Sequence, residues 1–406
     1  MSDDLTRNEI LSAGPDDGDW SDVISRASRA RRRYQVRAAV LVTALVVVGA
    51  ASAYALTHHG QPWCKEKPGE AWKKTLASHV VELSRHVSVA PIAIAGDGHS
   101  FYAEIYSKSY SGIVKIDAIT SHYVKIQRDT YWAMGSADER WFVWADQVNG
   151  YGATRAIWSW DSRTGRLRRI MAPRRSIDGE WPSASNPVVR GDYATWSQGA
   201  TDYVSDVHVV DLSNGRDRVI YSGSASEPFF LSGSVVAWVE NVSAPKSKNP
   251  DFVLRAANAL TGRRVTLPRG LRDLPSFGAT TLVTDGGAFV YSPEWLSLWW
   301  SPSLATPARR VFPIRRQGRQ LENSLQLAGH YVSFQTQTGG TDYLVDASNG
   351  GYVKMEWPIE LLNTKVMVFG GPSPSKAAHS IHDVSFVPLK SIPAIRSCPE
   401  PVTATG

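Results

Sequence analysis

Cysteine is nearly absent from this chain, which has only two cysteines among 406 residues. Two cysteines cannot form the dense disulfide framework of small secreted domains, and they cannot supply a zinc site made of four thiolates. Charged residues are also few, at 20% of the chain, whereas hydrophobic residues make up 43%. This balance excludes a largely disordered chain and indicates a globular protein.

Catalytic signatures are lacking as well. No Gly-x-Ser-x-Gly turn of the hydrolase type is present. The histidine pairs His58/His59 and His379/His382 have no third ligand at a recognisable spacing, and zinc normally needs three or four ligands. The net charge of +6 comes without a basic helix or an RNA-binding motif. We therefore expect no catalytic residue set, metal, cofactor or nucleic-acid partner.

Only one long hydrophobic run is present, at residues 38–56, where AAVLVTALVVVGAASAYAL contains no charge. As a helix it just spans a bilayer core of roughly 30 Å. Basic residues beside a span are retained in the cytoplasm, and this run follows Arg26, Arg29, Arg31, Arg32, Arg33 and Arg37. We expect a transmembrane helix with a cytoplasmic N-terminus. A cleaved signal peptide is the alternative, because small residues near Tyr54 resemble a cleavage site.

The segments beside this run are not expected to form a core. Residues 1–37 combine an acidic stretch with a basic one and are poor in large apolar side chains, which predicts a disordered cytoplasmic tail. Residues 57–74 are expected to be a juxtamembrane linker. The remaining chain would then lie outside the cell membrane.

A short turn motif recurs through the remaining chain. It opens with Asp or Asn, and four of its five copies have Gly four residues later: Asp117, Asp161 with Gly165, Asp211 with Gly215, Asn258 with Gly262, and Asp346 with Gly350. The Asp or Asn side chain can bond the backbone two residues on, and Gly supplies positive φ for a hairpin. Successive copies start 44, 50, 47 and 88 residues apart. The doubled last gap predicts a degenerate copy near residue 302, and SLATPARRVFP from Ser303 fits it.

An aromatic residue that follows a Gly or polar turn is the second recurring feature. Seven such residues occur, at Tyr102, Trp144, Trp196, Trp238, Tyr291, Phe334 and Phe369. Each unit thus predicts four short strands over about 45 residues, which is typical of a β-propeller blade. A solenoid of helices is excluded, because the hydrophobic residues alternate with a period of two.

The pattern P-x-x-x-G-x-x-x-x-W, followed by V-x-x-x-D-L-x-x-G-x-x-x-x-[IL], resembles the TolB-like β-propeller repeats of bacterial periplasmic and surface proteins, and more loosely WD40-like blades. This resemblance implies an all-β fold with seven blades, or alternatively six, over residues 75–398, with a C-terminal tail at 399–406. The resemblance implies almost nothing about function. The SPDG turn common in such repeats is missing here, and the first and last units are degenerate.

The last unit lacks an outer strand of its own. The apolar segment TLASHVVELSRHVSV, which starts at Thr75, has no hairpin partner. We expect it to complete the last blade, because closing the ring removes an unpaired edge. Cys64 and Cys398 lie just outside the two ends of the predicted ring, so we also expect a disulfide bond between them in an oxidising exterior. Two separate thiols are the alternative.

Two arginine-rich runs and a tryptophan cluster each allow two interpretations. The runs, Arg166 to Arg175 and Arg309 to Arg319, could form a basic patch for an anionic envelope polymer or lipid, or could protect exposed strand edges with charge. The cluster of Trp295, Trp299 and Trp300 could stack on sugars or pack within a blade. Arginines also follow other turns and the tryptophans occupy a third-strand position, so we favour the structural interpretation of both.

Variable loops between the second and third strands should gather on one face of the ring, where rigid scaffolds carry binding loops. We expect a ligand there or at the mouth of the central channel. The sequence therefore predicts a membrane-anchored, extracytoplasmic binding module for a protein or a cell-envelope component. A propeller hydrolase or lyase with a site in the channel is the alternative.

Overall fold

The computed structural model describes residues 65–66, 69–83, 87–130, 132–148, 153–171, 184–201, 204–225, 228–242, 252–272, 274, 281–292, 297–313, 325–336, 341–355, 357–370 and 384–395. All of them belong to the compact unit that extends from Cys64 to Gly406. The predicted tail at 1–37, the predicted membrane span at 38–56 and both cysteines lie outside the described residues.

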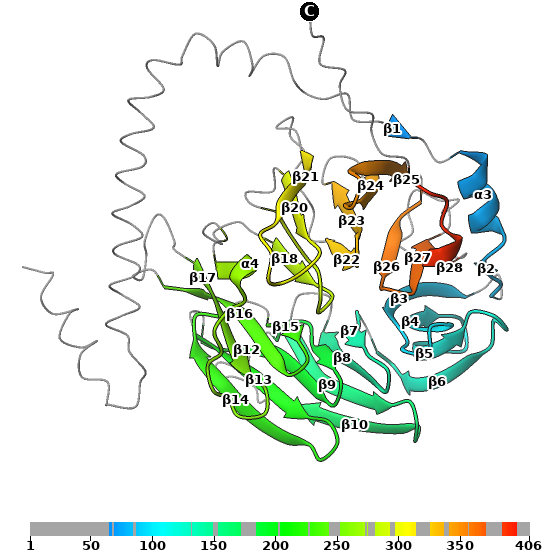
Figure 1. Ribbon diagram of the computed structural model, residues 1–406. Helices are drawn as coiled ribbons and strands as arrows, with labels where there is room; N and C mark the ends of the chain where they lie inside the picture. Colours follow the sequence, from blue (N-terminus) through cyan, green and yellow to red (C-terminus); the bar gives the residue numbers. More distant parts are fainter. Residues whose placement is uncertain are drawn as a thin grey trace, which may run out of the picture. The chain divides into compact units, whose positions relative to one another are not determined.

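Seven β-sheets form the blades of a propeller (Figure 1). Blade 1 contains β3 (Ser88–Ile94), β4 (Ser100–Tyr106), β5 (Ser111–Asp117) and β6 (Tyr123–Arg128). Blade 2 contains β7 (Met134–Ala137), β8 (Trp141–Val148), β9 (Ala153–Asp161) and β10 (Arg166–Met171). Blade 3 contains β11 (Val188–Arg190), β12 (Tyr193–Thr201), β13 (Val204–Asp211) and β14 (Arg216–Gly223).

The remaining blades follow in chain order. Blade 4 contains β15 (Phe229–Ser232), β16 (Val235–Asn241) and β17 (Phe252–Asn258). Blade 5 contains β18 (Thr281–Thr284), β19 (Phe289–Ser292), β20 (Ser297–Ser301) and β21 (Arg309–Pro313). Blade 6 contains β22 (Gln326–Ala328), β23 (Tyr331–Thr336), β24 (Thr341–Asp346) and β25 (Gly351–Met355). Blade 7 contains β26 (Ile359–Leu362), β27 (Val366–Gly370) and β28 (Val384–Pro388).

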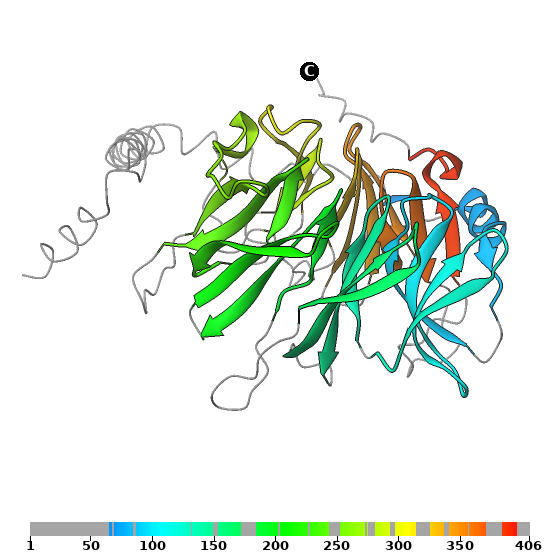
Figure 2. The same ribbon diagram turned by 90° about the horizontal axis from the view of Figure 1, so that it is seen from below.

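The first strand of each blade is the innermost one. These strands contact their counterparts in neighbouring blades around the axis, as in the pairs β3 with β7, β7 with β11, and β26 with β3. The sheets stand side by side when the ring is viewed from its edge (Figure 2). Seven blades, rather than the alternative of six, therefore surround the axis.

The ring closes through an N-terminal strand. β2 (Val80–Val81) pairs antiparallel with β28, joining Val80 to Ser385 and Val81 to Val384. This is the seam expected from the segment after Thr75. The start of that segment differs from the expectation, because its first residues end α3 (Glu70–Ala77). Trp72 and Leu76 of this helix are buried against blades 6 and 7, since they lie four residues apart on one helix face.

A second N-terminal contact lies on blade 6. β1 (Lys65–Glu66) pairs in parallel with the outer strand β25, with Lys65 beside Tyr352, and gives that blade a fifth strand. Residues 57–74 were expected to form a linker outside the ring. The structure instead joins the chain to the propeller from Lys65 onward, because the edge of β25 is open to pairing.

Blade 4 departs from the four-stranded unit. Its outer position holds only an isolated bridge between Ala257 and Arg264, followed by α4 (Arg269–Arg272). Pro268 comes shortly after this bridge, and proline cannot donate a ladder hydrogen bond. Leu271 of α4 is buried instead and covers the core of blades 4 and 5. A short helix thus replaces most of the missing strand.

Aromatic side chains fill the space between blades. Tyr102 of blade 1 stacks on Phe142 of blade 2 with ring centroids 4.0 Å apart, and Phe142 stacks on Trp144 at 4.7 Å. All three side chains are almost entirely buried. Because each blade packs through such residues, the ring is rigid enough to position loops at its two faces.

Candidate functional site on the loop face

The two faces of the ring are built from different connections. Neighbouring strands are antiparallel, so the tight turns after the first and third strands of each blade share one face. We call it the turn face. The connections after the second and fourth strands share the opposite face, which we call the loop face. The second and third strands that flank the predicted variable loops meet the loop face, and part of each of these loops lies outside the described residues.

Trp132 is the most unusual described residue of the loop face. It lies between β6 and β7, its side chain is 59% exposed, and its φ is 54°. A bulky residue in this left-handed region is strained. Among the described non-glycine residues, only Ser121 and Asp129 share a positive φ. Such strain persists where surrounding contacts enforce it, and it is concentrated at functional sites.

A buried carboxylate holds the backbone next to Trp132. Glu104, at the end of β4, is only 2% exposed. Its Oε2 atom accepts a hydrogen bond of 3.4 Å from the backbone N–H of Ala133. Its Oε1 atom is buried and has no hydrogen-bond partner among the described residues. Glu104 therefore fixes the loop that presents the Trp132 ring to solvent.

A second buried acid lies near Glu104 in the next blade. Asp146 of β8 is 3% exposed. Burial raises the pKa of Glu104, and the nearby charge of Asp146 raises it further, while hydrogen bonds from Tyr106 and from the backbone of Ala133 and Trp132 oppose the rise. A negative charge near a carboxyl group disfavours the ionised form of that group. We call Glu104 and Asp146 the buried acid pair.

Three exposed residues adjoin the groups that contact Glu104. Tyr106, at the end of β4, and Met134, the first residue of the innermost strand β7, are both exposed, as is Trp132. These three side chains form the apolar rim, and together with the buried acid pair they form the loop-face site. Its exposed aromatic rings can stack on a flat or cationic group, and the acids give its floor a negative or proton-donating character.

Acids recur at inter-blade positions elsewhere on this face. Glu360 of the innermost strand β26 has its pKa raised to about 7, by burial and then by the charge of Asp342. Asp342 in turn accepts a hydrogen bond from the backbone N–H of Ile359. In blade 4, Glu240 is instead neutralised by Arg255, with Nε and Oε2 2.6 Å apart.

The predicted turn residues all lie on the turn face, in separate blades. A side-chain oxygen of each accepts a hydrogen bond from the backbone N–H two residues on: Asp117 from Ile119, Asp161 from Arg163, Asp211 from Ser213, Asn258 from Leu260, and Asp346 from Ser348. Positive φ angles occur at Gly165, Gly215, Gly262 and Gly350. The degenerate copy was predicted to start at Ser303, but the structure starts it two residues earlier, where the Ser301 hydroxyl accepts from the Ser303 N–H. These residues shape the turns and are not brought together.

The predicted blade aromatics all lie in second strands and are at most 6% exposed: Tyr102, Trp144, Trp196, Trp238, Tyr291, Phe334 and Phe369. They belong to the packing between blades. Three of them, Tyr102, Trp144 and Trp238, precede an acid by two residues. This spacing was a signal for Glu104, Asp146 and Glu240 that the sequence reasoning missed.

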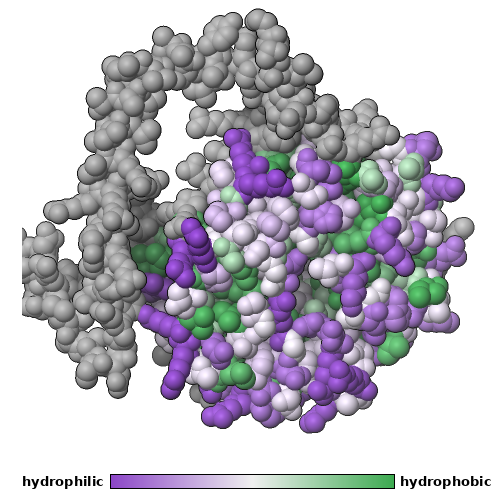
Figure 3. Space-filling view, in the orientation of Figure 1, coloured by the Kyte–Doolittle hydropathy of each residue, from purple (hydrophilic) through white to green (hydrophobic). Residues whose placement is uncertain are grey.

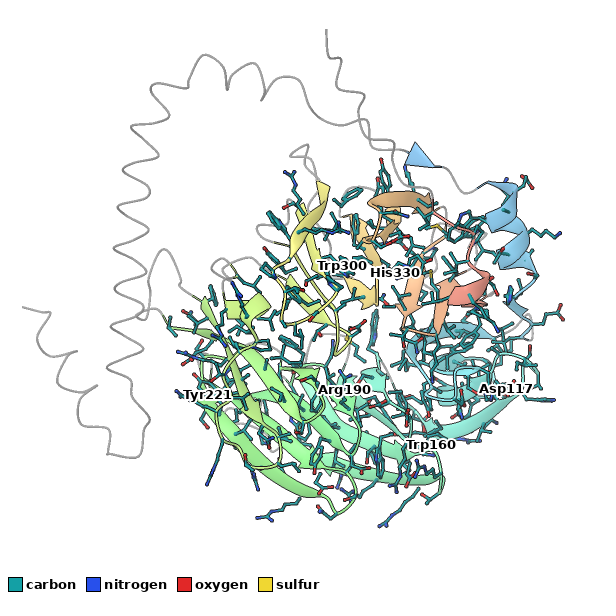
Figure 4. All side chains as sticks on the ribbon, in the orientation of Figure 1. Asp117, Trp160, Arg190, Tyr221, Trp300 and His330 are labelled. Carbon is teal, nitrogen blue, oxygen red and sulfur yellow. The ribbon has the colours of Figure 1, made fainter. Side chains whose placement is uncertain are left out.

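The tryptophan cluster and one arginine run also have structural contacts. The Trp300 indole donates to the Gly329 carbonyl at 3.0 Å, and Trp299 stacks on Tyr291. Arg309 donates to the Ala347 and Ser348 carbonyls in the next blade. Figure 4 shows Trp300 on blade 5 and also Arg190 near the middle of the ring, where it donates to the Asp285 carbonyl.

No group of three or more potential metal ligands occurs among the described residues. The histidine pairs His58/His59 and His379/His382 and the cysteine pair lie outside that part of the chain. The loop-face site therefore rests on its aromatic rim and on its buried acids.

Solved structures resemble the fold but not the sequence. An oligogalacturonate lyase from Vibrio parahaemolyticus matches with a TM-score of 0.51 and 10% identity, over 76% of this chain and 93% of that one. The β-propeller domain of the trilobed protease from Pyrococcus furiosus, described as having an open velcro topology, matches with a TM-score of 0.51 and 10% identity, over 70% of this chain and 91% of that one. At such identity the likeness defines an all-β propeller and nothing finer.

Neither a family model nor a curated protein sequence matches this chain. The class of protein is therefore the seven-bladed β-propeller. The expected TolB-like identity is not established by these comparisons and remains a prediction.

Proposed function

We propose that this chain is a membrane-anchored, extracytoplasmic propeller that binds a protein or cell-envelope component at its loop-face site. The observation that carries this proposal is the exposed, left-handed Trp132. A left-handed backbone costs of the order of 1–3 kcal/mol, and an exposed Trp ring gains nothing from water. A partner that covers the ring would account for both the strained backbone and the exposed ring of Trp132.

The residue types of the apolar rim support a binding role. Trp and Tyr are enriched among residues that dominate binding energy, and Met adapts to irregular surfaces. Trp132, Tyr106 and Met134 belong to three different strands or connections, so a ligand would contact blades 1 and 2 together. The buried acid pair below them favours a partner with a positive group at its tip, which could also lie over the Trp132 ring.

The test compares two exposed apolar residues on opposite faces. Full-length chain carrying Trp132→Ala is expected to lose most of the partner that the unchanged chain retains after cross-linking in intact cells. Ile119→Ala is the matched control, because Ile119 is 79% exposed in a turn-face loop. Equal loss from both variants, or no loss from Trp132→Ala, would contradict binding at the loop-face site.

An enzyme is the second candidate function, and Glu360 is the observation that favours it. A carboxyl group with a pKa near 7 is suited to general acid catalysis at neutral pH, and Glu360 lies on an innermost strand. Its test is a screen of polysaccharide and peptide substrates with Glu360→Gln. Turnover that this variant abolishes, but that Glu70→Gln on the exposed surface of α3 retains, would replace binding by catalysis as the function.

Anchoring by residues 38–56 is part of the proposal and rests on the sequence. None of the helices within the described residues is long and apolar enough to cross a membrane, and 38–56 lies outside them. Full-length chain should stay with membranes after alkaline carbonate washing, whereas a chain that starts at residue 57 should be released. Release of both would contradict the anchor.

A further inference from the structure

Two cavities on the turn face have the same construction in consecutive blades. The first, of about 200 Å³, is lined by Arg140, Trp141, Asp161, Arg166 and Arg168 of blade 2 and by Leu212 of blade 3, among others. The second, of about 210 Å³, is lined by Tyr193, Asp211, Arg216 and Arg218 of blade 3 and by Leu260 of blade 4. Each thus combines an aromatic residue, an aspartate and two arginines of the outer strand with an apolar residue of the next blade, and the first pocket has Arg140 as a third arginine. We call them the paired arginine pockets.

The turn itself does not require these arginines. In both pockets they follow the turn aspartate by five and seven residues. Blade 1 has His122 and Val124 at these places, and blade 6 has Gly351 and Val353, although both blades form the same turn. Blade 4 has Arg263 at the first place but Val265 at the second, so among the blades with this turn only blades 2 and 3 have both arginines.

The aspartates of the pockets are already engaged. Arg140 Nη2 lies 2.6 Å from Asp161 Oδ2, and this guanidinium lowers the pKa of Asp161 to about 2. Asp211 accepts hydrogen bonds from Ser213 and Asn214 of its own turn. The positive charge of the pocket arginines is therefore not taken up by direct pairing with these carboxylates.

Within each pocket, one arginine is held and the other is exposed. Arg168 lies so close to Gly215 that a Cβ there would be 2.4 Å from its Nη2 atom. Arg218 donates to the Leu260 carbonyl. Arg166 and Arg216, at the start of the outer strands β10 and β14, are exposed. Neither forms an ion pair with another described residue, and the rim over these strands is hydrophilic (Figure 3).

We propose that the paired arginine pockets bind successive anionic groups of one linear polymer, such as an acidic polysaccharide with a carboxylate or phosphate on each repeat. A guanidinium fork can donate two parallel hydrogen bonds to two oxygens of a carboxylate or of a phosphate. Trp141 and Tyr193 add an aromatic side chain beside each anion. The proposal is independent of the loop-face site, since it concerns the opposite face of the ring.

Two like pockets in neighbouring blades specify an extended ligand. A short oligomer can fill one pocket only, whereas a longer chain binds the second pocket intramolecularly at high effective concentration. Affinity should therefore rise steeply with chain length until both pockets are spanned. It should also fall as salt increases, because exposed charges are screened.

Titration of the full-length chain in detergent tests the proposal, with labelled oligouronates of two and eight residues as carboxylate probes and polyphosphate as the phosphate probe. Arg166→Gln and Arg216→Gln should each reduce the affinity for the longer probe about tenfold. The double variant should bind the long and the short oligouronate with equal affinity. Arg169→Gln is the matched control, because Arg169 is exposed on the same strand as Arg166 but lines neither pocket. It should alter affinity less than twofold.

The two anion sources give distinguishable results. Pocket-dependent binding of only one probe identifies the anionic group, and binding of both identifies charge and spacing as the recognised features. Affinity that is independent of length, an equal loss from Arg169→Gln, or binding only to anionic lipid vesicles would overturn the proposal. Unchanged thermal unfolding of the variants shows that any loss is not due to misfolding.

Discussion

The turn face and the loop face of this propeller differ in whether their local structure repeats from blade to blade. The repeated turns on the first are each closed by their own aspartate, asparagine or serine, as with Asp211 and Ser213 at 2.9 Å. On the second, a single loop places an exposed Trp132 above a buried Glu104, and no other blade repeats this arrangement among the described residues. The turn face is thus stabilised by a turn that repeats, whereas the loop face has an arrangement of Trp132 and Glu104 that occurs once among the described residues.

This difference indicates two kinds of binding. A surface that repeats from blade to blade offers equivalent sites at regular intervals, which suits a polymer of identical units. A surface that occurs once suits a ligand with one distinctive group. The four predictions that follow test how far the two faces differ, in order of the expected effect.

The largest effect is expected where β1 and Ile395 contact blade 6 near its turn. Lys65 pairs beside Tyr352 just after the turn of blade 6, and the side chain of Asn349 in that turn donates to the Ile395 carbonyl. Cys64 and Cys398 lie outside the described residues, but their neighbours Lys65 and Ile395 both contact this turn region or the strand that leaves it. We predict a Cys64–Cys398 disulfide bond that contributes on the order of 5 kcal/mol at most.

Denaturant unfolding of serine variants checks the bond. Cys64→Ser, Cys398→Ser and the double variant should lose the same stability, because any of them removes the one bond. A reductant should lower the denaturant midpoint of unfolding of the unchanged chain but should not change that of any variant. Additive losses, or no response to the reductant, would indicate two separate thiols.

The second prediction contrasts a tryptophan inside the ring with the one on the loop face. Trp196 is fully buried between blades, whereas Trp132 is 59% exposed. Trp196→Ala should reduce the free energy of unfolding by about 4 kcal/mol, because it leaves a large cavity. Trp132→Ala should change it by less than about 0.5 kcal/mol, as is usual for exposed sites. A large loss from Trp132→Ala in denaturant unfolding would assign that ring to the core.

These two tryptophans also show how much the sequence could predict. Trp196 is one of seven recurring aromatic residues, four of which follow a Gly by five positions, and this recurrence predicted the propeller. The missing outer strand of the last unit predicted that the segment from Thr75 closes the ring, and β2 of that segment does pair with β28. Trp132 belongs to no repeat. Its exposure depends on a left-handed backbone and on Glu104, which lies far from it in sequence. Sequence periodicity cannot report a contact that occurs only once.

The third prediction concerns the acids of the loop face. Burial raises the pKa of Glu360 from 4.5 to about 7, so the folded state holds its proton more tightly than the unfolded state. Stability should therefore fall as pH rises from about 4.5 to 7, by up to about 3 kcal/mol. Glu360→Gln should flatten that part of the stability curve measured by denaturant unfolding. A slope unchanged by the substitution would show that Glu360 titrates normally.

The smallest effect tests the repeated turns against each other. Asp161 is 4% exposed and accepts two hydrogen bonds from Arg140. Asp211 is more exposed, and within the described part of the chain its side chain accepts hydrogen bonds only from its own turn. Asp161→Asn should therefore reduce the free energy of unfolding by about 2 kcal/mol at pH 7. Asp211→Asn should reduce it by less than half of that amount. Because the pKa of Asp161 is lowered to about 2, its contribution should be lost as pH falls from about 4 to 2. Equal costs at pH 7 would mean that the turn alone, and not the contact with Arg140, determines what an aspartate contributes on this face.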